Sequence, residues 1–240
     1  MWLRRVFFDL MDILTAIRER ISTRAFLDKP VSEDTVRAIL DDARWAPSGG
    51  NLQPWKVHVV AGKARQAVID AVKAKMETDP FADENSFPVY PEKLWEPYRS
   101  RRYAVGEQMY EILNIPREDK MGRLGQVLKN FDFFDAPVGL FFTIDPKMNP
   151  NQWAHLGMFI YAVTLAAEGH GLATCMQEAW TRFTLTVGKV LDLPEDEQVY
   201  CGLALGYADP DAPLNTMRTA RASVDEIAGF RGFDGSNDAA

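Results

Sequence analysis

VYCGLALGY, residues 199–207, is an almost uninterrupted apolar run near the end of the chain. A strand that is covered on both faces has a continuous apolar sequence rather than an alternating one. The composition of this segment therefore predicts a strand at the centre of a sheet. The rest of the expected fold is arranged around it.

Three further segments have the composition of strands. Trp55–Ala61, WKVHVVA, alternates in polarity, Pro137–Ile144, PVGLFFTI, is typical of a buried strand, and Leu172–Met176 is a short candidate. Helical spacing of apolar residues predicts helices over 13–21, from the cap at Ser32 to Pro47, and over 63–76, 101–114, 118–134, 152–168 and 181–191. Strands separated by helices predict an α+β domain with a mixed central β-sheet flanked by helices.

The composition excludes several classes of function. The 240 residues are 47% hydrophobic and 25% charged, as in an ordinary globular protein, and the net charge of −7 argues against nucleic acid as the main partner. No apolar run approaches the roughly 18 residues needed to cross a membrane. Cys175 and Cys201 lie far apart without a C-x-x-C pattern, and the histidines lack metal-ligand spacing. We expect a cytoplasmic protein without a disulfide framework or a metal.

The length fits a single domain over residues 11–230. Residues 1–10 read as an N-terminal extension, because Asp9 and Asp12 interrupt the apolar run that a signal peptide would need, and residues 231–240 read as a flexible tail. Residues 77–100 are rich in proline and aromatic residues and have no sustained period. An insert over about 77–110 could be a lid over a pocket or a surface excursion packed on the body.

Two segments near the start of the chain could bind a ligand. In an extended chain the side chains of Arg20, Ser22 and Arg24 share one face, and two guanidiniums beside a hydroxyl suit a phosphate. A solvated basic segment paired with nearby acids is the alternative. Residues 46–55, APSGGNLQPW, combine two glycines, which let the backbone approach a ligand, with polar side chains. This loop could also be a plain connector between a helix and a strand.

A third signal lies near the C-terminus, where Arg218 and Arg221 follow the last strand. They could bind an anion or simply be surface charges. The chain has neither a G-x-S-x-G elbow nor a P-loop. No catalytic triad or metal cluster is therefore evident to carry chemistry by itself.

Read in order, these segments resemble the nitroreductase family of flavin mononucleotide (FMN) enzymes. The resemblance covers about residues 11–230 and rests on RISTRAF, APSGGNLQPW, GHGLATCMQEAW, VYCGLALGY and the arginine before SVDEI. It implies the nitroreductase fold in an intertwined homodimer, with two FMN sites at the interface.

The resemblance also assigns roles to residues. Arg20 and Arg221 would bind the FMN phosphate with help from Arg218, Ser22 would contact the ribityl chain or the ring edge, and Arg24 would lie near flavin N1 and O2. The remaining contacts would come from Pro47, Ser48 and Asn51 of the partner subunit and from Met176, Gln177, Glu178 and Ala179 along the ring, with the backbone amide near Glu178 directed at N5. Many family members have proline and glycine where this chain has Met176 and Ala179.

The implied activity is ping-pong, two-electron reduction of nitroaromatics and quinones by NADH or NADPH, with the chemistry on the flavin rather than on a catalytic side chain. Substrate walls would come from the aromatic-rich insert, with Trp95, Tyr98 and Tyr103 as the main candidates beside Phe81, Phe87 and Tyr90. Two alternatives stay open. One is reductive dehalogenation of halogenated phenols, in which WEPYRSRR (residues 95–102) could hold a zwitterionic or phenolate ligand. The other is a non-catalytic dimer that stores or senses FMN.

Overall fold

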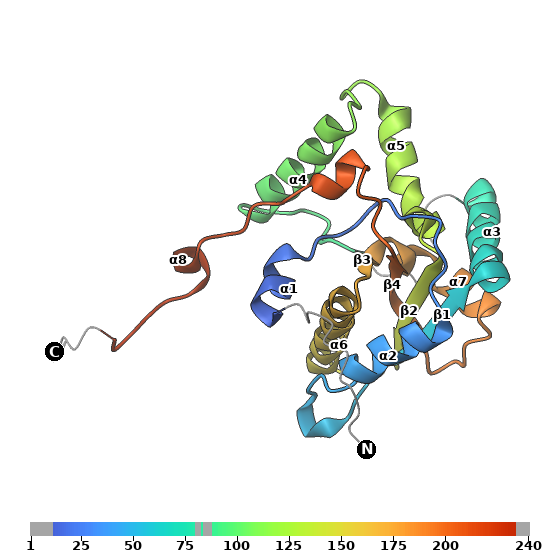
Figure 1. Ribbon diagram of the computed structural model, residues 1–240, viewed down its shortest axis with the longest axis horizontal. Coiled ribbons are helices and arrows are strands. Elements are labelled where there is room, and N and C mark those ends of the chain that lie inside the picture. Colours follow the sequence, from blue (N-terminus) through green and yellow to red (C-terminus); the bar gives the residue numbers. More distant parts are fainter. Residues whose placement is uncertain (1–11, 80–82, 84–87, 234–240) are drawn as a thin grey trace, which may run out of the picture.

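The computed structural model describes residues 12–79, 83 and 88–233. In chain order its elements are α1 (Ile13–Glu19), α2 (Glu33–Ala43), η1 (Gly49–Asn51), β1 (Lys56–Ala61), α3 (Gly62–Thr78), α4 (Tyr98–Ile112), α5 (Lys120–Leu128), η2 (Lys129–Asp135), β2 (Val138–Ile144), α6 (Pro150–Gly169), β3 (Ala173–Gln177), η3 (Glu178–Phe183), α7 (Thr184–Val190), β4 (Gln198–Gly206), η4 (Pro213–Thr216) and α8 (Val224–Ile227), where η marks a 3₁₀ helix. The fold is α+β, with helices around a central sheet (Figure 1). None of the described helices is long and apolar enough to cross a membrane.

The strand predicted over residues 199–207 lies inside the sheet, as expected. The strand order is β1-β2-β4-β3, so β4 has a hydrogen-bonded neighbour on each side. Leu203 of β4 pairs with Leu140 of β2 on one side and with Met176 of β3 on the other. The apolar run of β4 is thus explained by burial on both faces and pairing at both edges.

The prediction of a mixed sheet is wrong for the four named strands, because each neighbouring pair is antiparallel. Strands β2 and β3, which α6 connects, do run in the same direction. However, β4 inserts between them and runs opposite to both. Among the described residues, parallel pairing is limited to an isolated bridge between Ser22 and Thr174 at the β3 edge.

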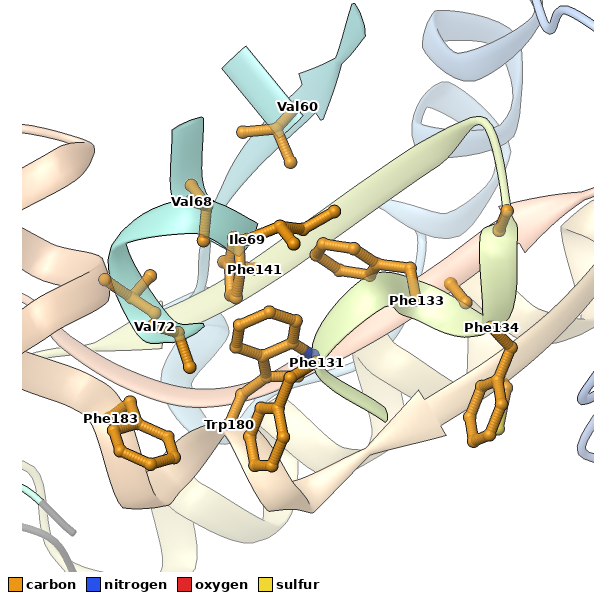
Figure 2. Packing of buried hydrophobic residues seen from close by; sticks show 14 of the residues in the cluster. Val60, Val68, Ile69, Val72, Phe131, Phe133, Phe134, Phe141, Trp180 and Phe183 are labelled. Atoms are coloured by element: carbon orange, nitrogen blue, oxygen red, sulfur yellow. The ribbon is translucent and has the colours of Figure 1, made fainter. Parts of the chain in front are cut away.

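Each face of the sheet is covered by a separate apolar layer. Along β2, Leu140 and Phe142 belong to the cluster formed with α2 and α6, whereas Phe141 belongs to the opposite cluster. This alternation follows from the two-residue period of a strand. The second cluster gathers side chains of α3, η2, η3 and α7 around Trp180, as Figure 2 shows.

Two glycines on the sheet make room for the large rings of this second cluster. A Cβ atom at Gly202 would overlap the ring of Trp180, and one at Gly139 would overlap the ring of Phe133. Both rings are fully buried and lie 4.7 Å apart between centroids. The glycines of β2 and β4 are therefore required by close packing and not by a turn.

The helix predicted over 118–134 is shorter than expected. Helix α5 ends at Leu128, and η2 follows with positive φ angles at Phe133, Phe134 and Asp135. Both phenylalanines of this left-handed turn are buried. Tertiary packing thus overrides the local helical spacing.

Other boundaries lie close to the predictions. Ser32 caps α2 by accepting a hydrogen bond from the Thr35 backbone N–H at 3.1 Å. The strand expected from Trp55 begins at Lys56, and the Trp55 ring stacks on Phe159 of α6. The insert expected over 77–110 is helical in its second half, where α4 begins at Tyr98. Phe81, Phe87 and residues 1–10 lie outside the described residues.

The chain ends do not share the compact packing of the sheet. Beyond residue 217 the chain forms an arm, residues 217–233, whose outer part with α8 stands away from the body in Figure 1. Apart from Met217 at its base, which is buried, its large apolar side chains are exposed, with Ile227 at 72% and Phe233 at 80%. Helix α1 likewise exposes Ile13 and Leu14. Apolar surface of this extent marks an interaction face.

Candidate functional site

Five arginines surround one cavity between α1, the segment after it and the base of the arm. The cavity has a volume of about 400 Å³, and its basic lining consists of Arg18, Arg20, Arg24, Arg218 and Arg221. Ser22 lines it as well, and no described lining residue is acidic. We call it the arginine cavity. The structure therefore brings together two sequence signals that lie about 200 residues apart.

Backbone pairing positions the first of these segments. The Thr23 N–H donates to the Thr174 carbonyl at 2.9 Å, which places Ser22 and Arg24 along the β3 edge. Asn215 connects this segment to the start of the arm. Its side-chain oxygen accepts from the Arg24 N–H at 3.0 Å, and its amide donates to the carbonyls of Ala25 and Asp209.

Most of these arginines have few protein partners, so the cavity retains positive charge. The Nε atom of Arg20 is buried and has no hydrogen-bond partner among the residues that the structure describes. Arg218 lies 3.6 Å from the carboxylate of Glu19, and Arg221 donates to Thr219 beside it. A buried guanidinium N–H without an acceptor is costly, and an anionic ligand would satisfy it.

One acid lies near this charge without lining the cavity. Burial raises the pKa of the Glu168 carboxyl at the end of α6, while Arg20 and Arg218 act in the opposite direction. The guanidinium of Arg20 also lies 5.9 Å from the ring centroid of Tyr161 on the same helix. The arginine cavity therefore adjoins the C-terminal half of α6.

A second cavity, of about 570 Å³, lies between α4, the end of α5 and β3. We call it the α4 cavity. Its wall is formed by apolar and polar side chains and three arginines: Arg24, Tyr90, Arg101, Arg102, Val105, Met109, Gln126, Val127, Asn130, Phe134, Cys175 and Met176. Arg24 borders both cavities. A ligand that extends from one cavity to the other would thus pass this guanidinium.

The residues predicted to follow a flavin ring begin at the wall of the α4 cavity. Met176 is 42% exposed and lines it, whereas the side chain of Gln177 is buried. That amide donates to the Asn130 carbonyl at 2.7 Å and accepts from the Trp180 indole N–H, so only the backbone of Gln177 is available to a ligand. Burial raises the pKa of Glu178, the next residue, which with Ala179 begins η3.

The predicted substrate residues are dispersed. Trp95 and Tyr98 contact each other edge to face at 5.4 Å, are exposed, and line neither cavity. Tyr103 lines a neighbouring hollow between residues 91–94 and α4. Tyr90 is the aromatic residue of the insert that the structure places in the α4 cavity.

The loop of residues 46–55 lies elsewhere. The Gly49 N–H donates to His155 Nδ1 at 3.4 Å, near the start of α6, and Ser48 accepts from the Gln53 N–H. Thirteen residues of α6 separate His155 from Glu168, which corresponds to about 20 Å of helix. Within one chain, Pro47, Ser48 and Asn51 are therefore not brought to the arginine cavity.

Sequence reasoning missed several features of the site, including Arg18 in the lining of the arginine cavity. Asn215 holds Arg24 in place, yet it lies in a turn of ordinary composition and gives no signal in the sequence. Arg102 lines the α4 cavity, and the only available signal was its position within the basic WEPYRSRR segment. Side chains that act through tertiary contacts cannot be identified from local pattern alone.

The chain is similar to proteins of known activity over most of its length. It is 38% identical over 223 residues to a 4-nitrobenzoate reductase of Pseudomonas putida, covering 93% of this chain and 97% of that protein. It is 38% identical over 214 residues to a nitrobenzene nitroreductase of Ectopseudomonas oleovorans, covering 89% and 94%. The crystal structure of an FMN- and NADPH-dependent nitroreductase, NfnB from Sphigopyxis sp. strain HMH, superposes with a TM-score of 0.89 at 42% identity, covering 93% of this chain and all of that one. Residues 17–207 match the Nitroreductase family, and the chain belongs to that family.

Proposed function

We propose that this protein is an FMN-dependent oxidoreductase that reduces nitroaromatics and quinones with electrons from NADH or NADPH. The observation that carries the proposal is the arginine cavity, with five guanidiniums and the unpartnered Nε of Arg20. The relatives support the reaction, since two are named for nitro compounds and a third is described as FMN- and NADPH-dependent. Their names cover both charged and uncharged nitroarenes, so they leave the charge of the acceptor open.

The arginine cavity fits the phosphate of FMN. A phosphate monoester carries a charge of about −1.5 to −2 at neutral pH and binds best to guanidinium forks. Arg20 and Arg221 would bind it, with Arg218 as a further donor, and a phosphate oxygen would satisfy the Nε of Arg20. Ser22, on the same wall, would contact the ribityl chain or the ring edge.

When bound, FMN would supply the hydride chemistry, which amino-acid side chains do not perform. Arg24 borders both cavities, so its guanidinium would stabilise negative charge that arises at their junction during reduction. Met176, Gln177, Glu178 and Ala179 would follow the ring, with the backbone near Glu178 facing the reacting edge. The α4 cavity would admit donor and acceptor in turn, from which we expect ping-pong kinetics, and Trp95, Tyr98 and Tyr103 would lie at its approach.

We further propose that the protein works as an intertwined homodimer. Support comes from the apolar side chains that one chain leaves exposed on α1 and on the arm. A second copy would cover this surface. Its loop of residues 46–55 would reach the arginine cavity of the first copy, which the first copy's own loop does not reach. Pro47, Ser48 and Asn51 would thereby serve the cofactor of the partner. The buried free thiols of Cys175 and Cys201 are consistent with the proposed cytoplasmic location.

The test is to purify the protein, identify the released flavin, and assay NADH and NADPH oxidation against nitroaromatics, quinones and halophenols. Arg20→Ala and Arg221→Ala should each reduce flavin content at least tenfold, because each removes a charge-assisted phosphate contact. Arg37→Ala is the matched control, since Arg37 pairs with Glu33 on α2 and is well exposed. Full flavin retention in both cavity variants would contradict the site.

The same assay separates the alternative functions. Turnover of halophenols but not of nitro compounds would favour dehalogenation. Tight flavin binding without turnover of any acceptor would favour storage or sensing. The names of the relatives favour nitro reduction over both.

A further inference from the structure

The α4 cavity has a charge that nitro reduction by itself does not require. Three arginines line it, Arg24, Arg101 and Arg102, and none of its described lining residues is acidic. A nitro group is neutral overall and needs no cationic wall to enter an apolar cavity. Arg24 would serve the flavin, so the guanidiniums beyond it favour a ligand that carries a negative charge of its own.

We propose that this cavity selects aromatic acceptors that carry a carboxylate or a similar anionic substituent, and that Arg102 binds that group. The inference rests on the proposed function, because it names the substrate class of the same site. It adds a specificity-determining residue to the reaction. It also sets charge, rather than ring size, as the property that the cavity recognises.

The contacts of the three arginines single out Arg102. Arg101 is already engaged, since its Nη2 lies 3.1 Å from Glu226 of the arm. Arg24 borders the arginine cavity and donates to the Ser22 carbonyl at 3.3 Å. Within residues 12–79, 83 and 88–233, Arg102 has neither an ion pair nor a hydrogen bond from its side chain to the protein, so its five N–H donors remain for a ligand.

The ring of Tyr90 lies against this guanidinium. The Arg102 Cζ atom lies 4.3 Å from the centroid of the Tyr90 ring, the distance of a cation–π contact. A stacked guanidinium keeps its edge N–H groups directed sideways, where they match the two oxygens of a carboxylate. The contact thus orders Arg102 without using its hydrogen-bond donors.

The apolar part of the lining suits an aromatic ring. Val105, Met109, Val127 and Phe134 provide apolar surface, and Met176 adds a thioether on the β3 side. At about 570 Å³ the cavity is within the usual size for small-molecule sites. A benzoate-sized acceptor could therefore place its ring on the apolar wall and its carboxylate on Arg102.

The experiment compares 4-nitrobenzoate with methyl 4-nitrobenzoate, which is close in shape but uncharged, on the flavin-loaded enzyme. Wild type should have the higher kcat/KM for the acid. In Arg102→Gln the ratio of acid to ester should fall about 10- to 100-fold, mostly through KM, because a charge-assisted bidentate contact is lost. Arg102→Lys should recover part of the ratio, and Arg37→Gln on α2 serves as the charge-matched control.

Two outcomes would overturn the inference: a wild type that prefers the ester, or an unchanged ratio in Arg102→Gln. A rise in KM for NADPH but not for NADH in Arg102→Gln would also overturn it, because Arg102 would then bind the donor phosphate. Calorimetry with benzoate, which cannot be reduced, provides a readout independent of turnover. Benzoate binding that Arg102→Gln abolishes supports the anion site even if no nitro compound is reduced. Nitrobenzene turnover without benzoate binding contradicts this inference and leaves the proposed function intact.

Discussion

Apolar side chains are buried around the sheet but exposed at the chain ends. Trp180 and Phe141 are fully buried between the sheet and its second layer, whereas Ile227 and Phe233 of the arm are mostly exposed. The comparison shows that one chain is sufficient for the core but leaves its ends without a covering surface. We infer that the sheet sets the stability of the fold, whereas the exposed ends fit the proposed homodimer, in which a second copy would cover them.

The largest effect is expected from Gly202→Val, which tests the core side of this comparison. A valine side chain would overlap the buried ring of Trp180, and neither the strand nor the ring has space to move. Overpacking of this kind should lower the free energy of unfolding by about 3 kcal/mol or more. Soluble yield and thermal unfolding followed by near-UV circular dichroism measure the loss. In the control, Gly157→Ala on α6, the new methyl group meets no atom within 4 Å, and the midpoint should stay the same or rise slightly because alanine favours the helix.

An intermediate effect is expected from combining two variant chains in one dimer, which tests whether a second copy completes the site. One chain carries Arg20→Ala, and the other carries Ser48→Ala with Asn51→Ala. If the loop of residues 46–55 serves the neighbouring subunit, a mixed dimer contains one intact site and one doubly altered site. Differently tagged chains, co-expressed and purified as the mixed dimer, should bind about half of the wild-type flavin, whereas each variant alone should bind little. Absence of recovery in the mixed dimer would contradict the proposal that the loop serves the cofactor of the neighbouring subunit.

The smallest effect is expected from Glu197→Gln, at the end of the sheet far from the arm. Burial raises the pKa of Glu197, but hydrogen bonds at 2.7 Å from Lys56, His58 and Thr143 outweigh it and lower the pKa to about 2. Losing these charge-assisted bonds should cost about 1–3 kcal/mol of unfolding free energy at pH 7.

The sign of the pH dependence follows from this lowered pKa. The stabilisation by Glu197 is complete above its unfolded pKa of about 4.3 and is lost as the pH falls towards 2. The difference between wild type and Glu197→Gln in urea unfolding should therefore shrink as the pH falls from about 5 to about 2, the range that contains these two pKa values. A difference that stays constant over this range would show that the carboxylate charge is not responsible.

Much of the fold could be predicted because its signals are local. The continuous apolar run of β4 indicated an interior strand, and Ser32 marked the start of α2. The direction of β4 could not be predicted, because it depends on pairing with β2 and β3, which lie far away along the sequence. The left-handed turn at Phe133 was missed for the same reason, since only the buried neighbours of its ring account for it.

The site was predictable in its charges but not in its geometry. Arg20, Arg24 and Arg221 were singled out in the sequence, and they do line one cavity. Their roles towards FMN remain predictions. Two contacts could not be predicted from the sequence: the hydrogen bond between Asn215 and Arg24, and the contact of Arg102 with Tyr90. The first joins residues that are distant along the chain, and the second depends on which side of α4 faces the cavity. Residue type indicates which chemistry is possible, and tertiary contacts decide which residue performs it.

The insertion of β4 has a consequence for the order of folding. Strands β2 and β3 are synthesised before β4 but cannot be joined until Gln198–Gly206 enters between them, so most of the chain must be synthesised before the sheet can close. Until then the facing edges of β2 and β3 lack their partner strand, and unpaired edges invite pairing with other chains. We expect truncations before residue 198 to aggregate during synthesis rather than persist as smaller folded units.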